Sequence, residues 1–222
     1  MFTCLHPGRF LLAILTSLLH PSTFGSLVIN GDFEAPSVQH DWVNFAAGQT
    51  LGGWTVGHGS VDLVTNAGFR EYWPAASGRQ SVDLNGWEPG SIWQEIPTVP
   101  GASYTLRFAL SGNPVGDPIR VTMAFLWDRD VMETLSFLTS SVSGDMGWTY
   151  HEYVLNAPGD TVRLAFESVS QTGPRGPALD DVSVSPVTPV PEASTFWGGL
   201  ALALAGAARL AAIRSPARDG SP

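Results

Sequence analysis

The sequence predicts an all-β sandwich, and three observations indicate it. Short segments of alternating apolar and polar residues follow one another between residues 26 and 190, with the period of half-buried antiparallel strands. Glycine, proline, asparagine and aspartate separate these segments, as turns require. No long segment with a helical period of 3.6 residues lies among them. Many short strands in one domain of about 160 residues favour two packed sheets.

The individual strands are placed by their alternation. Leu106, Phe108 and Leu110, for example, alternate with polar or smaller residues. The segments 113–118 and 171–177 are rich in proline and glycine, and we expect them as loops at the ends of the sandwich. In chain order the predicted strands are residues 26–29, 53–64, 80–84, 91–96, 103–111, 119–127, 131–137, 149–155, 161–169 and 179–185.

Residues 1–26 have the order of parts of a signal peptide. Arg9 provides the basic region, residues 10–19 are apolar, and small residues near Ser26 suit signal peptidase. Cys4 is the sole cysteine and would be removed with this segment. We therefore expect an exported domain without a disulfide.

The C-terminal segment predicts membrane sorting. Residues 187–195 form a proline-rich spacer, residues 196–214 an apolar helix of transmembrane type, and residues 215–222 a cytoplasmic tail. The uncharged run 196–208 is thirteen residues long, and as a helix it reaches about 20 Å against a hydrocarbon core of roughly 30 Å. This marginal length favours a temporary anchor over a permanent one. An ordinary buried helix is the alternative, but the chain has no second amphipathic helix to pack against it.

A short polar motif stands directly before the apolar run. It consists of Val190, Pro191, Glu192, Ala193, Ser194 and Thr195. With the apolar run and the arginines that follow, it resembles a PEP-CTERM sorting signal, in which alanine replaces the second proline of the usual Pro-Glu-Pro core. The resemblance implies processing by an exosortase-type enzyme at the inner membrane of a Gram-negative bacterium. It also implies a final place at the cell surface or in the extracellular matrix of a biofilm.

The charge of the exported part excludes one class of partner. Residues 26–190 include 18 acidic residues, seven arginines and no lysine. Such a domain repels nucleic acid and anionic lipid, so we expect no nucleic-acid partner. The acidic residues serve solubility, or some of them gather around a divalent cation.

Two motifs near the ends of the exported domain narrow the fold. Residues 30–34 read Asn-Gly-Asp-Phe-Glu, and residues 176–184 read Gly-Pro-Ala-Leu-Asp-Asp-Val-Ser-Val. The pair resembles the galactose-binding-like jelly rolls of carbohydrate-binding modules, whose first and last strands lie side by side. Four further motifs lie between them, at residues 59–64, 81–86, 89–94 and 110–114. In this order they are similar to the choice-of-anchor C family, related to a plant cell-wall family of unknown function. The resemblance implies a jelly-roll β-sandwich over residues 27–186.

The terminal motifs also predict a structural calcium site. Ca²⁺ takes six to eight oxygen ligands, and loops at strand ends supply them. Glu34 and either Asp180 or Asp181 would meet if the first and last strands are neighbours. In the related jelly rolls a structural Ca²⁺ is held there by the glutamate of the first motif and an aspartate of the last. The alternative is turn chemistry, with Asn30 and Gly31 in a tight turn and the two aspartates as hydrogen-bond acceptors.

Tryptophans are the candidate ligand-binding residues, because an indole offers a flat apolar face to the C–H groups of a sugar. Trp54, Trp93 and Trp127 lie in strand patterns, so we expect them to be buried. Trp73 and Trp87 lie in loop-like sequence next to glutamate and proline. We predict that these two form an exposed platform.

Together these features predict a non-catalytic surface or matrix protein that binds exopolysaccharide. No Ser-His-Asp order and no metal-binding pair of histidines is evident, and His40, His58 and His151 are isolated in the sequence. Two alternatives remain open. One is a purely structural matrix protein without a ligand, and the other is a glycoside hydrolase, whose two carboxylates would face each other roughly 5 to 10 Å apart.

Overall fold

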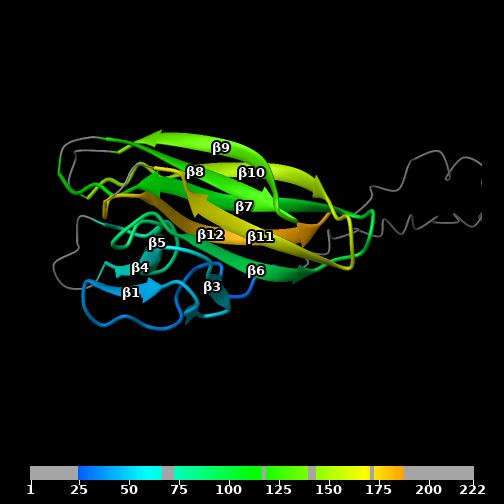
Figure 1. Ribbon diagram of the computed structural model, residues 1–222, viewed down its shortest axis with the longest axis horizontal. Helices are drawn as coiled ribbons and strands as arrows, with labels where there is room; N and C mark the ends of the chain where they lie inside the picture. The colour runs from blue at the N-terminus through cyan, green and yellow to red at the C-terminus, as the bar shows by residue number, and fades with distance from the viewer. Residues whose placement is uncertain (1–24, 67–72, 117–118, 140–143, 171–172, 188–222) are drawn as a thin grey trace, which may run out of the picture. The chain divides into compact units, whose positions relative to one another are not determined.

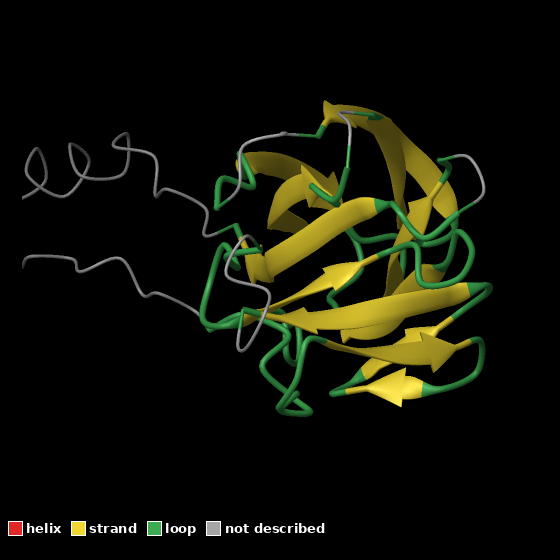
Figure 2. Ribbon diagram, turned by 90° about the vertical axis from the view of Figure 1, so that its left-hand side faces the viewer, coloured by secondary structure: helices red, strands yellow, loops and turns green. Residues whose placement is uncertain are grey.

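The computed structural model describes residues 25–187, apart from 67–72, 117–118, 140–143 and 171–172. Its strands form two antiparallel six-stranded sheets packed face to face, and these residues contain no helix (Figures 1 and 2). The predicted all-β sandwich is confirmed. No membrane-spanning helix is found within the described part of the chain. Residues 1–24 of the predicted signal peptide, the sorting motif, the apolar helix and the tail lie outside it.

The first sheet has the strand order β1-β4-β5-β12-β7-β10. Its strands are β1 (Trp42–Ala46), β4 (Ser60–Thr65), β5 (Gln80–Asp83), β12 (Pro177–Pro186), β7 (Ser103–Gly112) and β10 (Thr149–Asn156). The second sheet has the order β2-β3-β6-β11-β8-β9. Its strands are β2 (Thr50–Leu51), β3 (Trp54–Val56), β6 (Ser91–Pro97), β11 (Thr161–Ser168), β8 (Arg120–Trp127) and β9 (Asp130–Leu138).

The strands differ from the prediction in the N-terminal part of the domain. The predicted strand 53–64 is two strands, β3 and β4, in different sheets. They are separated at Gly59, which has a φ of 58°, and a side chain there would collide with the carbonyl oxygen of Pro89. Strands β1 and β2 were not predicted, because β1 lies at a sheet edge and most of its residues are exposed or partly exposed. An edge strand of this kind has no clear alternation.

The predicted strand at residues 26–29 forms turns and bends instead. The segment nevertheless runs beside β12, as expected for the start of the domain. The amide of Leu27 donates to the carbonyl of Val184 at 2.8 Å, and the amide of Val182 donates to the carbonyl of Gly31 at 2.8 Å. The start and end of the domain are therefore neighbours through isolated hydrogen bonds rather than through a continuous ladder.

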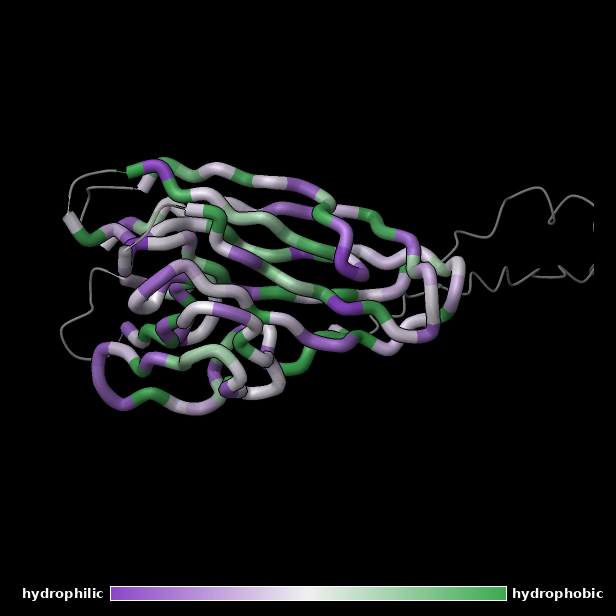
Figure 3. Tube along the Cα trace, viewed as in Figure 1, coloured by the Kyte–Doolittle hydropathy of each residue, from purple (hydrophilic) through white to green (hydrophobic). Residues whose placement is uncertain are grey.

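The core lies between the two sheets and is rich in aromatic rings. Phe108 of β7 contacts Phe125 of β8 and Phe166 of β11, with ring centroids 5.8 and 5.1 Å away, and all three side chains are fully buried. Hydrophobic and hydrophilic residues alternate along the strands (Figure 3). Trp54 and Trp127 are buried as predicted. Trp93 is only partly buried, because it lies on the outer face of the second sheet, where the guanidinium of Arg163 covers its ring.

Phe108→Ala is expected to lower the free energy of unfolding by about 3–5 kcal/mol, because it leaves a cavity between the sheets that the neighbouring rings cannot fill. Val154→Ala is the matched control, since this β10 side chain is 66% exposed, and its effect should stay within about 0.5 kcal/mol. Urea denaturation measures both. Equal losses in the two variants would contradict the position of the core.

Candidate ligand-binding site

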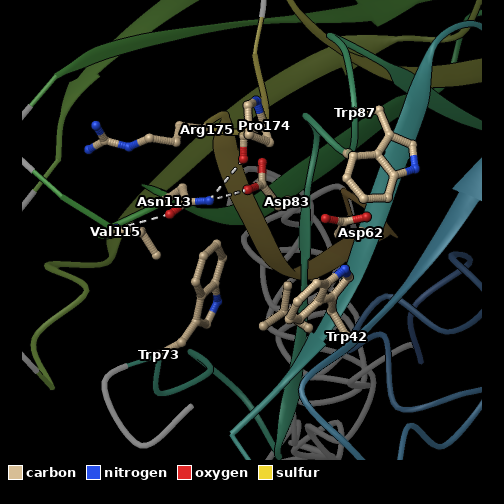
Figure 4. Close-up of a pocket in the computed structure, with 11 residues that line it drawn as sticks. Trp42, Asp62, Trp73, Asp83, Trp87, Asn113, Val115, Pro174 and Arg175 are labelled. Atoms are coloured by element: carbon tan, nitrogen blue, oxygen red, sulfur yellow. Dashed lines mark hydrogen bonds between the residues drawn. The ribbon is translucent and has the colours of Figure 1, made fainter. Parts of the chain in front are cut away.

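The outer face of the first sheet holds a pocket, at the part of the sheet formed by β1, β4 and β5. Along β4, Val61 and Leu63 are buried in the core, so Asp62 and Val64 face the opposite side. The pocket has a volume of about 320 Å³. Tryptophans and aspartates line it together with loop residues (Figure 4).

Three tryptophans line the pocket in two different ways. Trp42 of β1 is 41% exposed, and Trp87, in the loop between β5 and β6, is 72% exposed. The amide of Trp87 donates to Oγ of Ser60 at 2.8 Å, which ties this loop to the start of β4. Both indoles therefore offer accessible surface at the pocket. Trp42 was missed as a site residue in the sequence, although its place next to Asp41 and outside any clear alternation was a signal of partial exposure.

Trp73 differs from its predicted exposure. It is 2% exposed, because it packs against Val64, Met146 and Ala178 in a small apolar cluster outside the main core. Its Nε1 donates to Oγ of Ser81 at 2.9 Å. Trp73 is thus a fixed wall of the pocket and not an exposed platform, whereas the predicted exposure of Trp87 agrees with the structure.

Two aspartates lie side by side in the pocket. Asp62 of β4 and Asp83 of β5 are paired in the register of the two strands. Residues paired in this way lie on the same face of the sheet with their side chains adjacent. Nδ2 of Asn44 donates to Oδ1 of Asp62 at 2.7 Å. Sequence reasoning missed this pair, because the two residues become neighbours only through strand pairing.

Asp83 is fully buried and accepts three hydrogen bonds. The amides of Asn85 and Gly176 donate to its Oδ1 at 2.9 and 3.1 Å, and Nδ2 of Asn113 donates to its Oδ2 at 2.7 Å. Burial raises the pKa of the Asp83 carboxyl to about 8, and the charge of Asp62 adds to this, although the three donors act in the opposite direction. Burial of Asp83 therefore favours the protonated form of its carboxyl group.

Loops distant in the sequence complete the pocket. Nδ2 of Asn113 also donates to the carbonyl of Pro174 at 3.1 Å, and Nδ2 of Asn85 donates to the carbonyl of Gly173 at 2.8 Å. These bonds hold the described parts of the two predicted loops, 113–118 and 171–177, against the end of β5. In Figure 4 the guanidinium of Arg175 lies on the side away from the two aspartates.

The residues predicted to bind calcium lie outside this pocket. Glu34 Oε1 accepts two backbone amides of the loop 76–80, at 2.6 and 2.8 Å, and Asp180 Oδ2 accepts two others, at 2.8 and 2.9 Å. Asp181 pairs instead with Arg107, at 2.7 Å. Glu34 and Asp180 thus share a loop, while Asp181 does not join them. Within the described ranges no group of three acidic, histidine or cysteine side chains converges to hold a metal ion. Calcium binding stays a prediction.

Comparison with known proteins identifies relatives in sequence. A family model described as a protein of unknown function, DUF642, matches residues 26–185. Halomucin of Haloquadratum walsbyi is 31% identical over 166 residues. That similarity covers 72% of this chain but spans only 2% of the length of halomucin.

Solved structures resemble the fold at low sequence identity. The Stig cyclase Fisc from Fischerella sp. TAU has a TM-score of 0.51 and 14% identity, covering 74% of this chain and 99% of the cyclase. The carbohydrate-binding module TmCBM61, solved with beta-1,4-galactotriose, has a TM-score of 0.44 and 14% identity, covering 73% and 99% of the two chains. A family 35 carbohydrate-binding module from Clostridium thermocellum has a TM-score of 0.43 and 17% identity, covering 67% and 100%. At these identities the likeness concerns the fold alone.

The raised pKa of Asp83 predicts a stability that depends on pH. Between the ordinary value of 3.8 and about 8, the folded protein keeps a proton that the unfolded chain has lost. The contribution of Asp83 to the free energy of unfolding is therefore greatest at low pH and is lost as the pH rises through about 8. In Asp83→Asn this contribution is absent. The free energy of unfolding of the variant should therefore lie below that of the wild type, and this difference should shrink by on the order of 1–3 kcal/mol from pH 5 to pH 8.

Urea denaturation at the two pH values measures this change. Ser111→Ala is the matched control, because it removes a buried polar group of the same sheet that does not titrate, and its deficit should be the same at both pH values. A loss of free energy of unfolding in Asp83→Asn that is the same at both pH values would contradict the raised pKa of Asp83.

Proposed function

The chain belongs to the DUF642 family of proteins of unknown function, and we propose that it is a non-catalytic protein that binds carbohydrate. One observation carries the proposal. A single pocket combines the accessible indoles of Trp42 and Trp87 with the carboxylate of Asp62. Flat apolar faces beside hydrogen-bonding groups are what a sugar ring requires, since it has both C–H faces and equatorial hydroxyls.

The size and position of the pocket support a polysaccharide ligand. Its volume of about 320 Å³ is at the lower end of the range for ligand pockets, so it suits a short stretch of a sugar chain. Trp42 and Trp87 remain partly exposed at its rim, and in the view of Figure 4 Asp62 lies between them. A ring stacked on either indole would reach this carboxylate while the rest of the chain continued into solvent.

Catalysis is not part of the proposal. Asp62 and Asp83 are the closest counterpart of a glycosidase pair in this pocket. However, both oxygens of Asp83 accept N–H groups of the protein, which leaves this carboxyl poorly placed to give a proton to a leaving group. We therefore assign the pair to binding.

Export and sorting complete the proposal. The family match begins at residue 26, next to the expected signal-peptidase site, and ends at residue 185, before the motif 190–195. These limits are compatible with a choice-of-anchor C domain between a signal peptide and a PEP-CTERM tail. We propose an intermediate at the inner membrane, processing by an exosortase-type enzyme, and a mature protein at the cell surface or in the matrix, where exopolysaccharide is available.

Trp42→Ala and Trp87→Ala are each expected to weaken polysaccharide binding by at least about tenfold, because each removes a stacking face. Trp93→Ala is the matched control, a partly buried tryptophan on the outer face of the second sheet. A glycan array followed by calorimetry on the purified protein measures the effect. An equal loss in all three variants would contradict the site. Absence of binding to any polysaccharide would favour the structural alternative, and release of reducing sugar would favour the hydrolase.

Calcium near Glu34 and Asp180 is the remaining part of the proposal. Its support is that both carboxylates meet at the loop 76–80. A bound ion stabilises the folded state by mass action, so EGTA should lower the melting temperature and added Ca²⁺ should restore it. In Glu34→Gln this response to calcium should be lost. A melting temperature that EGTA leaves unchanged in the wild type would rule out the ion.

A further inference from the structure

One side of the pocket is an apolar wall. Trp73 forms part of it and packs against Val64, which also lines the pocket. Val115, in the loop after β7, belongs to the same wall and is exposed. In the view of Figure 4, Trp73 and Val115 lie on the side opposite Trp42 and Trp87. A ligand that stacks on one of the accessible indoles therefore has an apolar surface on its other side.

The polar groups next to this wall are used within the protein. Asp83 and Asn113 are both buried, and Nδ2 of Asn113 donates to Asp83 and to the carbonyl of Pro174. Oδ1 of Asn113 accepts the amide of Val115 at 3.0 Å, which also fixes Val115 in the wall. A ligand hydroxyl directed to this side would lose its water without gaining an equivalent partner. A methyl group in the same place would bury apolar surface at no such cost.

The opposite side of the pocket differs in its chemistry. The carboxyl group of Asp62, which the proposed function assigns to ring hydroxyls, lies between Trp42 and Trp87 in the view of Figure 4. The pocket thus offers hydrogen-bonding and stacking groups on one side and an apolar wall on the other. It suits a sugar whose hydroxyls are concentrated on one edge and whose other edge is apolar.

The kind of apolar substituent follows from the same wall. The methyl group of an N-acetyl or O-acetyl substituent is attached to a carbonyl, which would need a hydrogen-bond donor beside it. Nδ2 of Asn113 already donates to two groups of the protein there. The methyl group of a 6-deoxyhexose is attached directly to the ring and brings no further polar atom.

We propose that the pocket is specific for a 6-deoxyhexose unit of a polysaccharide, with its methyl group against Trp73 and Val115 and its ring on the indole of Trp42 or Trp87. This inference rests on the proposed carbohydrate binding and names its substrate class.

Two pairs of methyl glycosides test the proposal, because the members of each pair differ only in the hydroxyl at C6. They are L-rhamnose with L-mannose, and L-fucose with L-galactose, all as α-anomers. Calorimetry on the purified full-length protein should show the 6-deoxy member of at least one pair binding at least about tenfold tighter, as expected when the other member buries a hydroxyl without a partner. In saturation-transfer NMR the methyl protons at C6 should receive the strongest signal from the protein.

One variant and its control connect this preference to the wall. Val115→Thr keeps the shape of the side chain but replaces a methyl group by a hydroxyl, at a position that is 40% exposed. It should reduce the preference at least about threefold, because the new hydroxyl accepts the C6 hydroxyl and disfavours the methyl group. Val131→Thr is the same change on the edge strand β9 of the second sheet, where the side chain is 60% exposed, and it should leave the preference intact. Far-UV circular dichroism and thermal melting confirm that each variant is folded.

The outcomes separate this inference from the proposed function. Equal binding of both members in each pair would overturn the 6-deoxyhexose assignment and leave carbohydrate binding standing. So would failure of all four glycosides if the glycan array shows binding only to polysaccharides without 6-deoxy sugars. A preference that Val115→Thr and Val131→Thr reduce equally would overturn the assignment to the apolar wall. Failure of the four glycosides and of the whole array would overturn both proposals.

Discussion

The pairing of Leu63 with Val82 is the constraint on which the site depends. Both side chains are fully buried in the core, and burying them together sets the register of β4 and β5. Since successive residues of a strand point to opposite faces, Asp62 and Asp83 then have to face outward side by side. A slip of one residue would turn the apolar side chains to the outer face of the sheet and the acidic ones into the core, at a cost of several kcal/mol.

Asp83 in turn organises the loops of the pocket. Its carboxyl oxygens accept hydrogen bonds from the loop after β5, the loop after β7 and the segment before β12. These three segments are distant in the sequence, and burial of one polar group holds them together. An unsatisfied carboxyl at this position would be expensive, so the loops have little freedom to move away from it. The pocket wall is therefore shaped before a ligand arrives, which lowers the entropy cost of binding.

The two terminal motifs contribute through a different loop. Glu34 and Asp180 both accept backbone amides of residues 76–80, close to the point at which Trp73 enters the apolar cluster on the outer face. The carbonyl of Pro74 accepts a hydrogen bond from Nε1 of Trp148 at 2.9 Å, which fixes the same loop from the other side. The start and end of the domain thus support a wall of the pocket although neither motif lines it.

Local features of the sequence were sufficient to predict the class of fold and most of its strands. The alternation of apolar residues follows from burial of one face of each strand, so it can be read without knowing which strands are neighbours. The same holds for the buried Trp54 and Trp127, and for the acidic excess that disfavours nucleic acid. The edge strand β1 was not predicted, because neither of its faces is fully buried and its sequence has no clear period.

Tertiary structure alone decided which residues share the pocket. Trp73 has polar neighbours in sequence, yet Met146 and Ala178 cover it, and these lie more than 70 residues further along the chain. Asp62 and Asp83 belong to different motifs and become adjacent only through strand register. Burial and proximity of this kind depend on contacts between distant segments. The sequence by itself therefore determined the sandwich and the supply of aromatic and acidic residues, while folding determined their meeting in one pocket.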